Sequence, residues 1–169
     1  MKVNEELNAI LRAAYTEAKA REHEYLTPEH VLFASLYFDT PKEIILRCGG
    51  DVEDLREKIE DFFREKMTKT AEEKDPVQST VFQSVIERAV FHTISAQKKE
   101  LDIGDILISM MDEKESSAAH FLTREGITKM DLLNYVSHGT SVIPVQPERE
   151  DAPGTDETAE KEGRQTKAL

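Results

Sequence analysis

The same helical pattern of apolar residues occurs twice in this chain, and this duplication limits the folds that the chain can form. Apolar side chains recur three or four residues apart from Leu7 to Ala18, and the series from Phe82 to Thr93 repeats that spacing 75 positions later. The same offset pairs Leu26 with Leu101, Thr27 with Asp102, Val31 with Ile106, Leu32 with Leu107, Leu46 with Phe121, Val52 with Ile127 and Leu55 with Met130. A register kept over about 50 residues predicts an internal duplication.

Residues that favour helix starts and ends divide each half into four expected helices. The start signals stand at Asn4, Thr27, Thr40 and Asp51 in the first half, and at Thr80, Asp102, Ser116 and Thr128 in the second. Glycines at Gly49-Gly50, Gly126 and Gly139 are typical of helix ends. We therefore predict an all-α fold, an eight-helix bundle of two four-helix repeats related by a pseudo-twofold axis.

The domain limits follow from where this pattern lapses. We expect one domain over residues 1–140, with repeat one at about 4–66, a loop at 67–79 and repeat two at about 80–139. Residues 141–169 contain three prolines, acidic clusters and few large apolar side chains. Such a composition does not offset the entropy cost of ordering, so we expect a flexible acidic linker at the C-terminus.

The net charge favours one class of partner, and the cysteine content favours one cellular compartment. The 34 acidic and 22 basic residues give a net charge of −12, which disfavours nucleic acid and anionic lipid and favours a partner with basic groups. The single cysteine, Cys48, forms no intramolecular disulfide, and we expect a half-buried structural thiol rather than a nucleophile. The N-terminus shows no signal-peptide pattern, and no stretch reaches the ~18 apolar residues of a membrane span. We expect a cytoplasmic protein.

No arrangement of residues in the sequence points to catalysis. His23 and Glu24 are not followed by the second histidine of a zinc-protease helix, and zinc-type Cys/His pairs, a serine elbow and a phosphate-binding glycine loop are absent from the sequence. We expect no catalytic residue, no metal and no cofactor. A surface metal site near His23, and a pocket that joins His23 or His92 to a carboxylate, stay as alternatives.

Two pairs of side chains are interpreted as packing rather than as sites. Phe91 and His92 lie among apolar neighbours in the fifth expected helix, and we expect them in or near the core. Met110 and Met111 are interpreted as core filling, with a promiscuous peptide groove as the alternative.

Three segments together resemble the N-terminal domains of ClpA-type AAA+ unfoldases. They are Leu26–Leu32 (LTPEHVL), Arg88–His92 (RAVFH) and Tyr135–Gly139 (YVSHG), in that order over residues 1–140. The ClpC and ClpB families share this Clp N-domain fold, with ClpC the nearer. The resemblance implies a non-catalytic platform that binds substrate proteins and the ClpS adaptor for N-degron substrates. It also implies ClpP peptidase as a partner through motor domains outside this segment, and a monomeric isolated domain.

The resemblance also suggests which residues contact the adaptor. The matching positions are Glu24, Glu29, Ser79 and Ser84, and we expect both glutamates to be exposed near a helix start. From the residues alone, we interpret Glu24 and Glu29 as surface acids that complement a helix dipole. Ser84 stands where the family has arginine, so one cation for an adaptor is missing. The alternative function is a free-standing Clp N-domain-like protein that binds substrates or stress partners without a motor.

Overall fold

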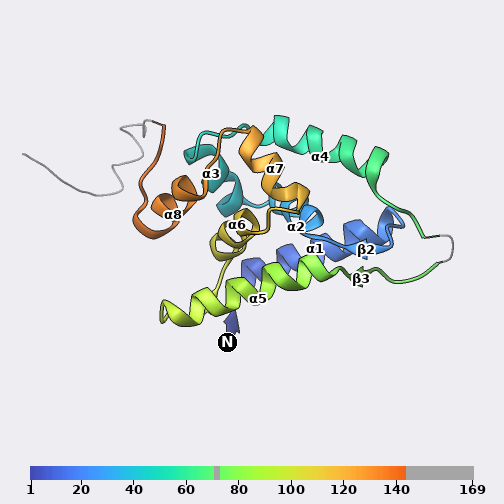
Figure 1. Ribbon diagram of the computed structural model, residues 1–169, viewed down its shortest axis with the longest axis horizontal. Helices are drawn as coiled ribbons and strands as arrows, with labels where there is room; N and C mark the ends of the chain where they lie inside the picture. The colour runs from blue at the N-terminus through green and yellow to red at the C-terminus, as the bar shows by residue number, and fades with distance from the viewer. Residues whose placement is uncertain (71–72, 144–169) are drawn as a thin grey trace, which may run out of the picture.

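The computed structural model describes residues 1–70 and 73–143, and these residues form eight helices and four two-residue strands (Figure 1). The helices are α1 (Glu5–Ala20), α2 (Pro28–Ser35), α3 (Asp39–Arg47), α4 (Val52–Lys66), α5 (Thr80–Ser95), α6 (Ile103–Asp112), α7 (Ser117–Arg124) and α8 (Lys129–His138). This architecture confirms the expected all-α fold.

Two short parallel ribbons tie the halves together, and they were not expected from the sequence. Strand β1 (Lys2–Val3) pairs with β4 (Glu100–Leu101), and β2 (Tyr25–Leu26) pairs with β3 (Val77–Gln78). A shift of 75 positions turns β1 into β3 and β2 into β4, so the two ribbons are counterparts under the duplication. A two-residue strand is too short to leave a periodic signal in sequence.

The 75-residue register does not continue through the whole repeat. It holds for the helix caps Asn4 and Ser79, but the left-handed glycines Gly49 (φ 93°) and Gly126 (φ 84°) are 77 positions apart. Helix α6 has ten residues where α2 has eight, which accounts for the change. The expected pairs Leu46 with Phe121, Val52 with Ile127 and Leu55 with Met130 are therefore wrong. Leu55 instead corresponds to Leu132, and both are fully buried, whereas Met130 is exposed.

Most of the expected helix starts are correct, and two are displaced by one or two residues. The side chains of Asn4, Asp51, Asp102, Ser116 and Thr128 each accept a hydrogen bond from a backbone N–H in the first turn of the following helix. Helix α3 begins after Phe38 rather than Thr40. Helix α5 is capped by Ser79 rather than Thr80, because Ser79 Oγ accepts the Phe82 N–H at 3.0 Å.

The core lies around α2 and α6, which occupy the middle of the molecule between the α1–α5 layer and helices α4 and α7 (Figure 1). Every residue of α2 is buried. Met110 is fully buried and Met111 packs partly buried against the core, which confirms both as core filling. Cys48 is also fully buried, deeper than expected.

The chain leaves α8 toward the end of α3. Gly139 (φ 71°) ends α8, and the Val142 N–H then donates to the carbonyl of Arg47 at 2.8 Å. The expected linker begins at residue 141, and its part from 144 to 169 lies outside the described residues. No helix in the described ranges has the length and apolar character needed to cross a membrane.

Candidate protein-docking site

The β2–β3 ribbon brings together two of the predicted contact residues that are far apart in the sequence. The carbonyl of Glu24 accepts the Val77 N–H at 3.1 Å, and the Ser79 N–H donates to the carbonyl of Leu26 at 3.0 Å. Glu24 and Ser79 thus flank the same pair of strands, at the starts of α2 and α5. Figure 1 shows β2 and β3 side by side at the same end of the molecule, next to the start of α5.

Three of the four predicted residues are accessible at this end. The Glu24 side chain is exposed, and Ser79 and Ser84 are half-buried. Ser79 is partly committed to capping α5, whereas Ser84 lies in the second turn of the same helix. Two apolar side chains of the ribbon that the sequence analysis did not single out, Tyr25 and Val77, are also exposed. We call Glu24, Tyr25, Val77, Ser79 and Ser84 the ribbon surface.

Glu29 does not belong to this surface, and its expected exposure is wrong. The residue is only 6% exposed, and its Oε2 atom accepts hydrogen bonds from Ser116 Oγ at 2.7 Å and from the Ala118 N–H at 2.8 Å. The carboxylate therefore caps the N-terminus of α7, where the helix dipole favours negative charge. Its two partners lie 87 and 89 residues away, so no local pattern in the sequence indicated this role.

A groove beside the ribbon surface offers apolar contact area. It has a volume of about 520 Å³ and runs between α1 and α5. Its apolar walls are Leu11 and Tyr15 from α1, Phe82 and Ile86 from α5, and Leu26 from β2. We call it the α1–α5 groove. Apolar walls next to exposed polar groups are typical of sites that bind another polypeptide.

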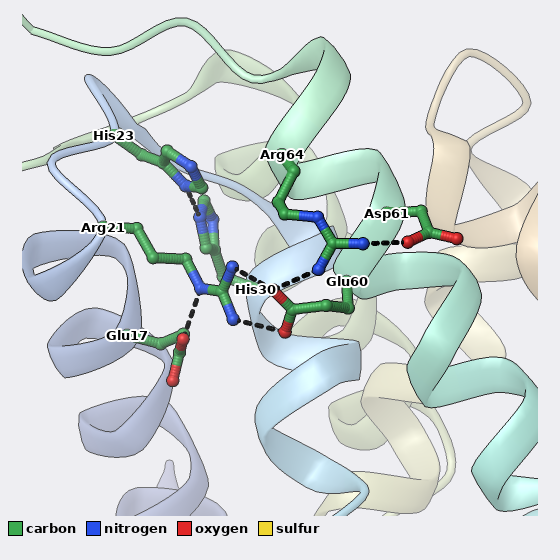
Figure 2. A network of polar contacts seen from close by, with 7 residues as sticks. All are labelled: Glu17, Arg21, His23, His30, Glu60, Asp61 and Arg64. Carbon is green, nitrogen blue, oxygen red and sulfur yellow. Dashed lines mark hydrogen bonds and ion pairs between the residues drawn. The ribbon is translucent and has the colours of Figure 1, made fainter.

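A buried pair of histidines flanks β2 in the sequence, with His23 before the strand and His30 in the first turn of α2 (Figure 2). His23 Nδ1 and His30 Nε2 are 2.8 Å apart, and His30 Nδ1 accepts the Thr27 N–H at 3.0 Å. Because His30 Nδ1 is an acceptor, the proton of the neutral ring is on Nε2, which donates to His23. His23 in turn hydrogen-bonds the backbone of Phe63.

Charged side chains lie around this neutral pair of histidines. Figure 2 shows Arg21 reaching from α1 to α4, where it binds both carboxylate oxygens of Glu60 at 2.8 and 2.6 Å. Burial lowers the pKa of His30 to about 3, with His23 and Arg21 acting in the same direction. Burial likewise lowers the pKa of His23, with Arg21 and Lys69 acting in the same direction. The pair is therefore a structural element that stays neutral at physiological pH.

A pocket between α5, α6 and α8 brings His92 together with Asp105 and Asp112, as one alternative required, but Asp105 pairs with Lys98 and Asp112 with Lys129. The alternative of a metal site near His23 finds little support in this geometry. Both ring nitrogens of His23 and of His30 have hydrogen-bond partners within the fold. Across residues 1–70 and 73–143, no three histidine, cysteine or acidic side chains converge as metal ligands would. Burial raises the pKa of the Cys48 thiol to about 11, which makes it a poor nucleophile.

The expected packing of Phe91 and His92 is also wrong. Phe91 is 66% exposed, and His92 is exposed beside it. The buried stripe of α5 includes Ala89 and Thr93. Phe91 stands midway between them, about 200° from each around the helix, so the spacing of the stripe already held the signal.

Comparison with known proteins agrees with this fold. The family model for the Clp repeat N-terminal domain matches residues 2–125. A ClpA homolog protein of Fuscovulum blasticum is 32% identical over 157 residues, which cover 91% of this chain and 20% of that protein. The chain thus spans about a fifth of the length of this relative.

Solved structures of N-terminal domains share the same arrangement of helices. The Hsp104 N-terminal domain from Candida albicans superposes with a TM-score of 0.72 at 14% identity, over 84% of this chain and 95% of that one. A complex of the ClpV N-domain with a VipB peptide superposes with a TM-score of 0.66 at 17% identity, over 83% and 89% of the two chains. By its sequence and its fold, this chain belongs to the family of Clp repeat N-terminal domains.

Proposed function

We propose that this domain docks proteins for a ClpA-like ATP-dependent unfoldase and has no chemistry of its own. In this proposal the ribbon surface receives a ClpS-type N-degron adaptor, and the α1–α5 groove receives apolar segments of substrate proteins. ClpP peptidase is a partner only through motor domains outside this segment. The observation that carries the proposal is the position of Glu24 and Ser79 beside one pair of strands, next to an apolar groove, with Ser84 in the second turn of α5.

The chemistry of the surface suits an adaptor with basic side chains. Glu24 is exposed and carries a carboxylate that can accept a charge-assisted hydrogen bond from lysine or arginine. Tyr25 and Val77 add apolar area at the same place, and aromatic side chains are enriched at protein interfaces. The VipB peptide in the ClpV N-domain complex supports polypeptide binding as a function that this fold can perform.

The proposal is tested by calorimetric titration of a purified ClpS-type adaptor into the domain. Glu24→Lys should raise the Kd at least tenfold, about 1.4 kcal/mol, because it places a cation against a basic partner. The matched control is Glu115→Lys, which makes the same charge change at an exposed position in the loop between α6 and α7.

Two results would count against the proposal. One is an unchanged Kd for Glu24→Lys, and the other is an equal loss for Glu24→Lys and Glu115→Lys, which would indicate a general charge effect. A Tyr15→Ala variant tests the groove separately, with an unfolded model peptide as the probe. Tyr15 is half-buried in the groove wall, so its loss should weaken peptide binding more than adaptor binding.

A further inference from the structure

The duplication permits a residue-by-residue comparison of the C-terminal ends of α1 and α5 and of the residues that follow them. Up to α2 and α6 the counterparts are 75 positions apart, and between α4 and α8 they are 77 apart, as their caps Asp51 and Thr128 show. Under this correspondence, Lys98 is the counterpart of His23, Asp105 is the counterpart of His30, and Ala96 is the counterpart of Arg21.

In repeat one, the space between α1, α2 and α4 is filled by Phe63. Its ring stacks on His30 at a centroid distance of 4.9 Å and meets the rings of His23 and Phe33 edge-on at 5.4 and 5.2 Å. The guanidinium of Arg21 covers the same ring at 4.9 Å. Phe63 stands in the last turns of α4, a helix of 15 residues, and is buried.

In repeat two, no side chain of residues 73–143 takes the place that Phe63 has in repeat one. Helix α8 has only ten residues and ends at Gly139, so the counterpart of Phe63 is Thr140, which lies beyond the helix end. The chain then turns away to α3, where Ser141 and Val142 contact the carbonyl of Arg47. Figure 1 shows α8 as the shorter helix of the two.

The result is an open groove of about 720 Å³ between α5, α6 and α8. Its lining includes Ala96, Lys98, Asp105, Ile108, Leu133 and Val136. Lys98 and Asp105 form an ion pair at 2.8 Å, at the positions that the two histidines hold in repeat one. Lys129 and Asp112 form a second pair at 2.7 Å along the same groove. The flanking charges are thus balanced, which favours an uncharged apolar occupant over an ion.

Exposed apolar side chains at the same end of α5 support a docking role. Phe91 is 66% exposed and Ile94 58% exposed. Their counterparts in α1 are the polar residues Thr16 and Lys19, so the duplication alone does not require apolar groups at these positions. Only one of the two related helices therefore carries such a patch beside an unfilled groove.

We propose that the groove between α5, α6 and α8 receives an aromatic side chain from a partner polypeptide, in the position that Phe63 fills in repeat one. The partner presents this side chain on a helical turn, as α4 does. Residues 144–169 contain no phenylalanine, tyrosine or tryptophan, so that segment does not supply it. This second docking site lies at the other end of α5 from Ser79 and Ser84 and does not depend on the proposed adaptor site.

The test uses a synthetic peptide with the sequence EKIEDFFREK, which copies residues 57–66, added to isotope-labelled domain and followed by NMR chemical shifts. We expect shifts centred on Ile108, Leu133 and Val136. A peptide with both phenylalanines replaced by alanine should bind at least tenfold more weakly, about 1.4 kcal/mol. The variant Ser137→Trp, at an exposed residue of the lining, should also weaken binding at least tenfold, because indole fills the groove.

The matched control is Asn134→Trp, the same substitution at an exposed residue of α8 outside the lining. It should leave the Kd of the peptide unchanged. The inference is overturned by the absence of shifts at about 2 mM peptide, by shifts centred on the α1–α5 groove, or by equal effects of the two tryptophan variants. Glu24→Lys should not affect this peptide, so failure of the adaptor site and failure of this site give different results.

Discussion

Mild acid should destabilise this domain through the buried imidazole of His30. Burial lowers the pKa of His30 from its ordinary value of 6.5 to about 3. Between these two values the unfolded chain binds a proton that the folded chain does not. The free energy of unfolding therefore falls as the pH falls below 6.5, and the loss continues until the folded pKa is reached.

The size of the effect follows from proton linkage. Lowering the pH from about 7.5 to about 5.5 should remove about 1.4 kcal/mol through His30 alone, since one pKa unit corresponds to about 1.36 kcal/mol. The pKa of His23 is also lowered, so this residue adds a loss of the same sign. Protonation of His30 at Nδ1 would also remove the acceptor of the Thr27 N–H.

The assay is urea unfolding at a series of pH values and constant ionic strength. The chain contains no tryptophan, so far-UV circular dichroism is the suitable signal for an all-helical fold. The informative variant is His30→Gln, because glutamine at the third helical position can still accept the Thr27 N–H. The variant loses the ring contact with Phe63 and should be less stable at pH 7.5, yet its stability should fall by about 1.4 kcal/mol less between the two pH values.

One result would contradict the neutral state of His30 in the folded domain. If the wild type and His30→Gln lose the same free energy of unfolding between pH 7.5 and 5.5, then His30 does not remain neutral in the folded domain at the lower pH. The difference between the two proteins is the decisive quantity, because other titrating groups contribute to both curves.

Three further predictions concern residues that the fold buries. Glu29→Ala should lower the free energy of unfolding by about 1.5–3 kcal/mol in the same urea assay, because it removes the charged acceptor of two hydrogen bonds at α7; an unchanged value would contradict its capping role. Gly50→Ala should cost about 1–3 kcal/mol, since a Cβ there would lie 2.8 Å from Ile127 Cδ1 and 2.9 Å from Ile45 Cγ2; a neutral effect on thermal unfolding would show that these side chains relax freely. Cys48 should react with a thiol reagent at pH 8 only after urea unfolds the chain, and rapid reaction of the folded domain would contradict its burial.

The two glutamates of the predicted site show that local sequence does not predict which side chains are exposed. Glu24 and Glu29 look alike in sequence, as acids near the start of one helix, yet the first is exposed and the second is buried. The difference arises because α7 approaches α2 and presents Ser116 to the carboxylate. Local sequence describes a residue's neighbours within about two helical turns, whereas this contact joins positions 87 residues apart.

Features that depend on near neighbours were determined by the sequence itself. Helix periodicity, the caps at Asn4, Asp51, Asp102 and Thr128, and the helix-ending Gly139 all act within one or two turns, so the pattern alone predicts eight helices in two halves. The three segments that resemble ClpA-type N-terminal domains are likewise short stretches of local sequence, and they indicated the right family.

The tertiary structure decided which surfaces are available to a partner. The parallel pairing of β2 with β3, the buried histidine pair and the groove left by the short α8 all depend on how the repeats pack. The duplication predicted two equal halves, but a two-residue difference between α2 and α6 and a five-residue difference between α4 and α8 make them unequal. Packing turns these small differences into a filled core on one side and an open groove on the other, because side chains that meet in space are seldom neighbours in the chain.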